Sequence, residues 1–549
     1  MIKHQSCSEH KAAVEADAMR RTIVRAETML EPQASDSPAI SASDKTLFAT
    51  VYFAAQRGFA NDSVNGILEL QRLNGAECSY VDLHSTMIAD VQCSLAALLD
   101  GQLEKKRTDS NFFGLLVDES TDISVHKTLI MYLRYVCHGV VTTDFIGNVR
   151  VRDGKAETLT AVIEAELLKL GINLSQVVGF GSDGASVMTG RNTGVGARLL
   201  QSCPGLVHIH CVAHRLNLAC VDAMRKNKYL ELVKENINFL FSYFHVSSLR
   251  SDKLQALQNA LGEPMTKLKH AIDIRWLAMY DAVVAVHTSY SSLVGVLIEE
   301  QANKQLACKG KAVLKFITQY NFPAVIALLS DVLKIVTRLS KKFQSDDIDL
   351  SSIKPSVSIA LSQIRSLDES PGSCMRDFFE NLVFEGDSVT YRGVALAAGG
   401  DEQDSFVSIR SSYIDSVIDA LSVRLINDST DALKLFGVIE PQSDCSADLT
   451  DHLDSIGQKF GSAIHVAELS REMQTVSDLK SGCYSGYSMQ AFAKALILRH
   501  SAELPQAAKL SELALCIPVS TAVCECGFSL QNWIKNKHRN SLNDSTLQI

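Results

Sequence analysis

The sequence predicts an α/β fold, in which a mixed β-sheet with helices packed on it is followed by a long helical segment. Between residues 112 and 224, short apolar or β-branched runs alternate with segments of helical period. From about residue 225 to residue 504 the pattern is almost entirely helical. Strands followed by alternating helices and strands are typical of a mixed sheet covered by helices.

The part of the chain before the sheet is expected to be mainly helical. Residues 11–30 are rich in helix formers, and residues 31–44 form a linker rich in Pro, Ser and Ala. Helical patterning resumes at Lys45 and ends at the polar segment 105–111.

The sheet region is expected to contain three strands, a helix, a strand, a helix, a strand and a helix, in that order. The first strand is an apolar run that leads into Asp118, and the fourth is a similar run that ends just before Asp183. His138 and Gly139 are expected to form a hairpin turn. The expected strands are 112–117, 128–136, 140–151, 176–181 and 206–210, and the expected helices are 157–170, 195–200 and 211–224.

Composition and charge exclude several classes of protein. The net charge of −9 means that the whole surface does not attract a polyanion, so any nucleic-acid contact needs a local basic patch such as 105–107 or 535–539. No stretch reaches the roughly 18–20 apolar residues that span a bilayer, and the N-terminal segment lacks the apolar region of a signal peptide. The 14 Cys have no framework spacing, which is typical of reduced thiols in the cytosol or nucleus.

Two acidic residues are placed where α/β sheets bind their ligands. Asp118 and Asp183 each follow an apolar strand, and ligands of open α/β sheets lie at the carboxyl ends of the strands. Two such carboxylates can hold divalent cations at roughly 2.0–2.6 Å. A third carboxylate from a packed helix would complete a two-metal site for phosphodiester chemistry. Taken singly, a strand-end Asp is more often a cap or a turn residue.

Five blocks stand out along the chain. They are Phe-Gly-Leu-Leu-Val-Asp-Glu-Ser-Thr-Asp at 113–122, Gly-Ser-Asp-Gly-Ala-Ser-Val-Met-Thr-Gly at 181–190, His-Cys-Val-Ala-His-Arg-Leu-Asn-Leu at 210–218, Ile-Arg-Trp at 274–276, and Ile-Pro-Val-Ser leading to Glu525, Phe528 and Arg539 at 517–539. In this order the blocks resemble the hAT (hobo/Activator/Tam3) transposase superfamily, and the last of them resembles its C-terminal dimerisation region. The sequence looks most similar to the zinc-finger-bearing, domesticated hAT proteins of animal genomes.

The resemblance implies an RNase H-like mixed sheet interrupted by a large all-helical insertion. In an active relative, Asp118, Asp183 and Glu525 would bind two Mg²⁺ or Mn²⁺ ions and cut DNA. Trp276 would stack on a displaced base and so bind DNA. The expected segments are a remnant zinc-finger tail and linker at 1–43, a helical preface at 44–110, the first part of the RNase H-like domain at 111–225, the insertion at 226–504, and the C-terminal dimerisation region at 505–549.

The sequence departs from the family pattern in two places. Cys526 follows Glu525 where the family usually has Arg. His4 and His10 resemble the end of a zinc finger, and two ligands cannot close a structural zinc site, so no zinc is expected.

The Cys-x-x-His block has two interpretations. Cys211 and His214 are expected to have a structural role in supporting the sheet. The alternative is a zinc site that they would form together with His208 and His210.

The prediction for function is a domesticated, hAT transposase-like nuclear protein. It would form a homodimer or higher oligomer through its C-terminal region, where Phe528 and Trp533 are the expected dimerisation residues, and it would bind DNA or another nucleic acid through the RNase H-like core. No membrane and no small-molecule substrate is expected as a partner. The alternative is an active, metal-dependent DNA transposase or endonuclease, which the presence of all three acids keeps open.

Overall fold

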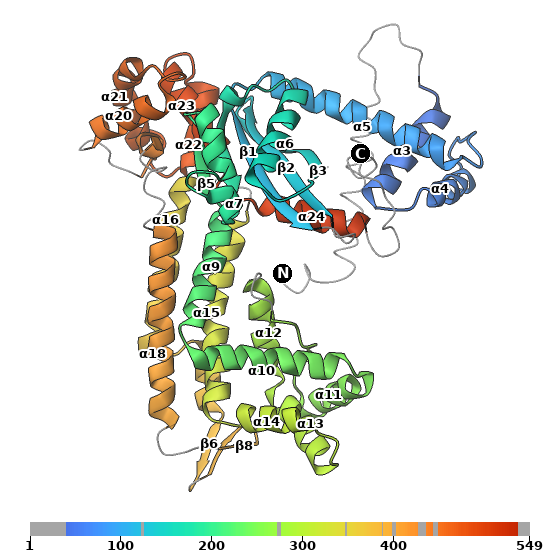
Figure 1. Ribbon diagram of the computed structural model, residues 1–549, viewed down its shortest axis with the longest axis vertical. Helices are drawn as coiled ribbons and strands as arrows, with labels where there is room; N and C mark the ends of the chain where they lie inside the picture. Colours follow the sequence, from blue (N-terminus) through green and yellow to red (C-terminus); the bar gives the residue numbers. More distant parts are fainter. Residues whose placement is uncertain are drawn as a thin grey trace.

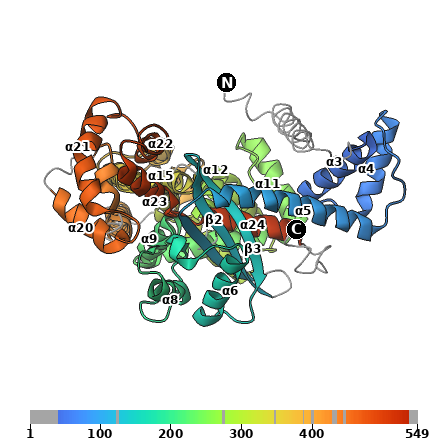
Figure 2. The same cartoon turned by 90° about the horizontal axis from the view of Figure 1, so that it is seen from above.

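A computed structural model of the protein describes residues 40–121, 126–271, 276–345, 348–386, 388–397, 402–426, 435–442 and 448–535. The molecule is elongated, with the β-sheet near one end and a stalk of long helices leading from it to a cluster of shorter helices (Figure 1). Seen from above, the N-terminal helices and the helices between residues 449 and 516 lie on opposite sides of the sheet (Figure 2).

The N-terminal unit is helical, with a small core of its own. Its first helix begins with a capping box, in which the Ser41 hydroxyl and the Asp44 carboxylate satisfy each other's backbone N–H groups. The last of its helices meets the sheet, because Ser110 after its end donates a buried hydrogen bond of 2.7 Å to the carbonyl of Val136. The three described helices are α3 (Ala42–Gln56), α4 (Asp62–Leu73) and α5 (Ser85–Thr108).

The five-stranded sheet has the strand order β3-β2-β1-β4-β5, which confirms the expected mixed sheet. The first three strands form antiparallel neighbours, whereas β1, β4 and β5 run parallel. The central strand β1 is apolar throughout its first half because helices cover both faces of the sheet. The strands are β1 (Phe113–Thr121), β2 (Lys127–Cys137), β3 (Val140–Arg150), β4 (Val177–Ser182) and β5 (Val207–His210), and the helices among them are α6 (Ala156–Lys169), α7 (Ser186–Thr189) and α8 (Val195–Ser202).

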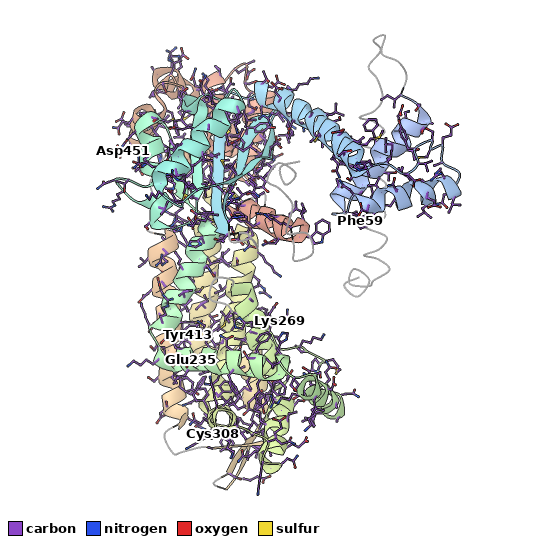
Figure 3. The ribbon with its side chains drawn as sticks, turned by 45° about the vertical axis from the view of Figure 1, so that its right-hand side comes forward. Phe59, Glu235, Lys269, Cys308, Tyr413 and Asp451 are labelled. Atoms are coloured by element: carbon purple, nitrogen blue, oxygen red, sulfur yellow. The ribbon has the colours of Figure 1, made fainter. Side chains whose placement is uncertain are left out.

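The insertion is built around a stalk of four long helices that contact one another (Figure 1). In Figure 3, Tyr413 lies along the stalk and Cys308 marks the end farthest from the sheet. The stalk helices are α9 (Val212–Arg225), α15 (Asn321–Phe343), α16 (Leu350–Glu369) and α18 (Glu402–Leu421), and the other helices up to residue 380 are α10 (Lys228–His245), α11 (Ser248–Leu261), α12 (Trp276–Thr288), α13 (Tyr290–Ala302), α14 (Cys308–Ile317) and α17 (Ser373–Glu380).

The insertion is not entirely helical, which corrects the expectation from sequence. A three-stranded antiparallel sheet of β6 (Leu382–Glu385), β7 (Ser388–Tyr391) and β8 (Val394–Leu396) lies at its far end. The strands are rich in β-branched and aromatic residues, and the turns contain Gly386 and Gly393 with positive φ. Each strand is too short to stand out from the helical pattern around it.

The segment divisions expected from sequence remain predictions. Helix α9, which was expected to close the first part of the RNase H-like domain at residue 225, also packs against α18 in the stalk. Among the described residues no single helix is long and apolar enough to cross a membrane, although the bent pair Ala278–Thr288 and Tyr290–Ala302 meets that test when taken together.

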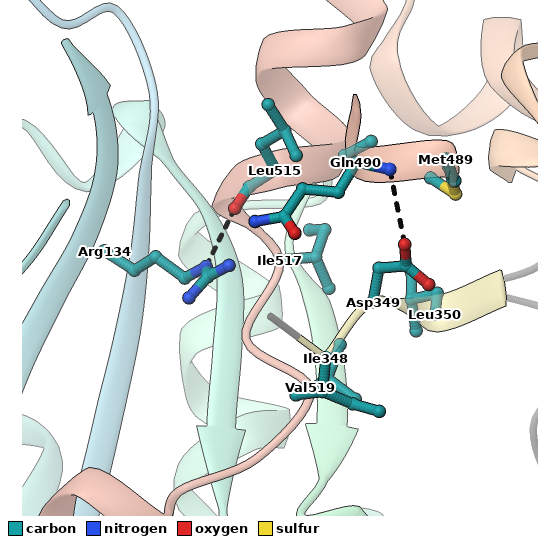
Figure 4. A pocket seen from close by; sticks show the side chains of 10 residues that line it. Arg134, Ile348, Asp349, Leu350, Met489, Gln490, Leu515, Ile517 and Val519 are labelled. Carbon is teal, nitrogen blue, oxygen red and sulfur yellow. Dashed lines mark hydrogen bonds between the residues drawn. The ribbon is translucent and has the colours of Figure 1, made fainter. Parts of the chain in front are cut away.

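After the insertion the chain returns to the sheet. A Cβ added to Gly114 of β1 would clash with the carbonyl oxygen of Cys516, and one added to Gly179 of β4 would lie 2.6 Å from the Pro518 ring. Arg134 of β2 donates from Nε to the Leu515 carbonyl at 2.8 Å, at a small cavity shown in Figure 4. The helices of this last part are α20 (Leu449–Phe460), α21 (Val466–Gly482), α22 (Met489–Arg499), α23 (Pro505–Cys516) and α24 (Ala522–Ile534).

Helix α24 approaches β2 closely at Gly527. A Cβ at this position would overlap Cδ1 of Ile130 and would lie 2.5 Å from the hydroxyl oxygen of Tyr132. A glycine in a helix lowers stability by about 1 kcal/mol relative to alanine. At position 527 the absence of a side chain permits close packing of α24 on the sheet. Ile130 and Cys524 form a small core with Leu116, against which Phe528 packs.

We predict that Gly527→Ala lowers the free energy of unfolding by about 1–2 kcal/mol, because overpacking against Ile130 exceeds the gain in helix propensity. The matched control is Gly66→Ala in α4, where a Cβ meets no atom within 4 Å, and it should stabilise by roughly 0.5–1 kcal/mol. Urea unfolding measures both. Adding Ile130→Val should recover part of the loss from Gly527→Ala, and equal effects of the two glycine variants would contradict the packing argument.

Candidate acidic site on the sheet

Strand alternation places two of the predicted acids on the same face of the sheet. Side chains alternate between faces along a strand. In β1, Leu115 and Val117 face the core formed with α6 and α8, whereas Leu116 faces α24. Asp118 therefore points to the α24 side. In β4, Gly181 faces Pro518 on that same side, so Asp183 does too.

The parallel register brings these acids to the same level. Leu116 of β1 lies opposite Gly181 of β4, so the residues that follow, at 118 and 183, are at matching positions on neighbouring strands. Asp183 is held in place by a 3.2 Å hydrogen bond that its Oδ1 accepts from the N–H of Ala185. Asp183 directly follows β4, whereas β1 continues to Thr121, so Asp118 lies within the strand opposite Ile130 and not after the strand's end as expected. The two acids thus lie on neighbouring strands and on one face of the sheet.

Glu525 completes the cluster from the first turn of α24. Its side chain is exposed, while the neighbouring Cys524 is buried against Leu116. Burial raises the pKa of Asp118 to about 7, and the negative charges of Asp183 and Glu525 contribute to that rise. The structure therefore brings Glu525 to Asp118 and Asp183, from which the whole insertion separates it in the sequence.

The donor set fits a hard divalent cation. The charged neighbours that raise the pKa of Asp118 are three carboxylates, those of Asp183, Glu525 and Glu119. Glu119 is paired with Lys127 at 2.6 Å, an ion pair that sequence reasoning did not identify. Carboxylate oxygens are the ligands of Mg²⁺ and Mn²⁺ in proteins. Asp118, Asp183 and Glu525 would hold such an ion, which supplies charge neutralisation for an approaching phosphate.

Cys211 and His214 lie beside this site, at the start of α9. The Sγ of Cys211 accepts a 3.2 Å hydrogen bond from the N–H of Thr521, directly before α24. Val212 donates its N–H to the carbonyl of Val519 at 3.1 Å. These contacts fasten the segment that leads into α24 to the start of α9.

The neighbouring histidines have separate surroundings. His208 Nε2 lies 3.1 Å from the Ser182 hydroxyl, and the His210 and His214 rings are 5.4 Å apart. Burial lowers the pKa of His208 to about 4 and that of His210 to about 3. Within the described residues the four candidate ligands around Cys211 do not form a metal-binding group, so the zinc alternative for this block has no geometric support.

The remaining predicted residues are not part of the acidic cluster, or their side chains lie outside the described residues. Trp276 is the first residue of α12, and its side chain lies outside the described part, as do His4 and His10. Phe528 packs on the sheet, and the ring of Trp533 lies against Gly58 of the N-terminal unit. In Figure 3, Phe59, the residue after Gly58, lies near the end of α24.

The two basic runs offer fewer surface cations than expected. Arg107 at the end of α5 is buried, and so is Lys535 after α24. Residues 536–539 lie outside the described part. Lys105 and Lys106 remain exposed on α5.

We predict that Asp118→Asn stabilises the cation-free protein at pH 8 by roughly 1–3 kcal/mol and leaves it unchanged near pH 4. The folded state favours protonated Asp118, because its pKa of about 7 exceeds the ordinary value of 3.8. The contribution of Asp118 to the free energy of unfolding is therefore fully present below pH 3.8 and is lost as the pH rises through about 7. Urea unfolding in EDTA at several pH values measures the difference. A difference that does not change with pH would contradict the raised pKa.

Two regions of the chain, which together contain the three acids, match the models of known families. Residues 80–194, which include β1 to β4, match the model of the ZMYM1/FAM200 RNase-like domain. Residues 493–549, which include α23, α24 and Glu525, match the hAT family C-terminal dimerisation region.

Two curated relatives are weakly similar to the chain. One is the "52 kDa repressor of the inhibitor of the protein kinase" of Mus musculus, 22% identical over 339 residues, and the other is the protein of the same name from Homo sapiens, also 22% identical. Each alignment covers 57% of this chain and 44% of the relative, so the chain matches less than half the length of either. The matches to an RNase-like domain and to the hAT C-terminal dimerisation region confirm, for these two regions, the resemblance to the hAT superfamily that the sequence indicated.

Proposed function

We propose that the protein is a domesticated, nuclear hAT-derived protein that binds DNA through its RNase H-like core and self-associates through its C-terminal region. The observation that carries this proposal is the convergence of Asp118, Asp183 and Glu525 on one face of the sheet. A cluster of three acids repels the phosphate backbone unless a divalent cation lies between them. DNA binding at this site is therefore expected to depend on Mg²⁺ or Mn²⁺.

A regulatory role is favoured over transposition by two further observations. Cys526 is a neutral, exposed residue next to Glu525, where the family usually supplies the positive charge of Arg. The curated relatives are named as repressors, which describes regulation in those proteins. A nuclear location fits DNA binding.

The second candidate function is a metal-dependent DNA endonuclease or transposase. The specific observation in its favour is that all three acids are present and close enough to raise the pKa of Asp118. Two-metal phosphodiester cleavage requires such a carboxylate set. Measuring both the binding and the cleavage of DNA distinguishes the two candidate functions.

We predict that Mg²⁺ strengthens binding of the full chain to a duplex DNA probe at least tenfold over EDTA, and that Asp183→Asn removes this gain. Fluorescence anisotropy at fixed ionic strength measures the affinity, because phosphate contacts depend strongly on salt. The matched control is Asp451→Asn, an exposed acid in the first turn of α20 that is not part of the acidic site.

The outcomes lead to different conclusions. Cation-dependent binding without cleavage supports the DNA-binding proposal. Nicking of supercoiled plasmid in Mn²⁺ that is lost in Asp183→Asn establishes the endonuclease instead. Affinity that is independent of both the cation and Asp183 excludes the RNase H-like core as the binding site.

Part of α24 is exposed and can be substituted to test self-association without removing packing on the sheet. Leu530 and Trp533 of α24 remain 53% and 49% exposed in the single chain, although they belong to the dimerisation region. Phe528, in contrast, packs against the sheet core. An exposed apolar strip on a dimerisation region is suited to contact with a second copy.

We predict that the wild-type chain sediments as a dimer or larger at low micromolar concentration and that Leu530→Asp weakens self-association at least tenfold without lowering the thermal midpoint. Leu168→Asp on α6, where the side chain is 78% exposed, is the control and should associate like wild type. Phe528→Ala should lower the midpoint, because it removes packing on the sheet. A wild-type monomer would refute the proposed interface.

A further inference from the structure

A cysteine, a histidine and an aspartate meet where the N-terminal unit joins the sheet. Asp109 follows the end of α5, while Cys137 and His138 lie at the turn between β2 and β3. One ligand atom from each of the three residues lies within 4.8 Å of the others, and His138 Nε2 is 3.5 Å from an oxygen of Asp109. This group lies outside the acidic site and outside the Cys-x-x-His block.

The backbone holds the three residues in place before any ligand binds. The turn has two residues, and both His138 (φ 49°) and Gly139 (φ 74°) are in the left-handed region that such hairpins require. This backbone conformation places His138 directly after the end of β2, next to Cys137. The Ser110–Val136 hydrogen bond of 2.7 Å joins the end of α5 to the end of β2, so both sides of the group share one rigid base.

The donor set and spacing match zinc. Thiolate sulfur, imidazole nitrogen and carboxylate oxygen bind Zn²⁺ at about 2.3, 2.0–2.1 and 2.0–2.2 Å, which places tetrahedral ligands about 3.3–3.6 Å apart. The Asp109–His138 separation is already 3.5 Å. Mg²⁺ and Ca²⁺ are disfavoured because they prefer oxygen ligands throughout.

The surroundings leave room for a metal. The side chains of His138 and Asp109 are 80% and 55% exposed, so the ion can enter from solvent and a water can be the fourth ligand. Cys137 is half-buried and not in a disulfide. Binding converts its thiol to a thiolate and releases the proton to solvent.

We propose that Asp109, Cys137 and His138 form a zinc site that fastens α5 of the N-terminal unit to the β2–β3 hairpin of the sheet. This proposal is independent of the acidic site and of DNA binding. The expectation of no zinc concerned the finger remnant at His4 and His10, whereas this site uses residues from a helix end and a hairpin that the fold brings together.

The test titrates the full chain with Co²⁺, whose bond to a thiolate produces a near-ultraviolet charge-transfer band. Cys7→Ser is the parent, which removes any thiolate near His4 and His10. We expect a saturable charge-transfer band that Zn²⁺ displaces, and a higher thermal midpoint in Zn²⁺. Adding Cys137→Ser should abolish the band and reduce the thermal shift, and adding His138→Ala should weaken the affinity measured from the band at least tenfold.

Cys93→Ser in the same parent is the matched control, because Cys93 is an exposed thiol on α5 itself and should leave the titration unchanged. The metal-free thermal midpoints show whether each variant is folded. Because His138 is on the surface, His138→Ala remains informative even if Cys137→Ser disturbs the strand. Absence of a saturable band in the parent, or its persistence in both variants, would overturn the proposal.

Discussion

The contact between the backbone around Cys516 and the glycines of the central strands determines how the two halves of the sheet domain fit together. Gly114 and Gly179 have no side chain, so the segment leading to Pro518 lies directly on β1 and β4. Larger residues would lift this segment off the sheet. Helix α24 continues from it, so the position of Glu525 depends on the same close approach.

The ends of the insertion are also held next to each other. The chain enters the insertion through α9, whose first residues bind the segment that returns from it: Val212 to Val519 and Cys211 to Thr521. Loop-closure entropy grows only slowly with length, so a long insertion with its own core can be accommodated once its ends are joined. An insertion with adjacent ends leaves the host domain intact, as in domain insertions generally. This explains how Asp118 and Asp183 of the sheet and the distant Glu525 can form one cluster.

Sequence reasoning predicted the features that depend on local pattern. The apolar runs before Asp118 and Asp183 identified β1 and β4, and the residues at 138 and 139 identified the hairpin turn. The expected end of β1 at residue 117 was wrong, because the strand continues through Asp118 to Thr121 in its pairing with β2. The position of Glu525 came from the family resemblance, because no local pattern brings a distant helix to a sheet. The short strands β6 to β8 were missed, since three- and four-residue strands carry little periodic signal.

Features that depend on tertiary contact could not be read from the sequence. The role of Gly527 depends on its packing against Ile130 and Tyr132 of a distant strand. The basic run 105–107 resembled a solvated surface, yet Arg107 is buried. The Asp109 cluster has no Cys-x-x-Cys spacing, because a helix end and a hairpin bring its members together.

At the acidic site, the stability of the cation-free fold and the affinity for a cation require opposite protonation states of Asp118. Near neutral pH the cation-free fold must keep a carboxyl with a pKa of about 7 next to two further acids, which favours the protonated form of Asp118. A bound cation reverses this preference, because it requires the ionised carboxylate and releases the proton. Cation affinity is therefore expected to fall as the pH drops below about 7, while the cation-free fold becomes more stable over the same range. Strongly shifted carboxyl groups of this kind are concentrated at functional sites, so the energetic cost to the fold itself supports a binding role for these three acids.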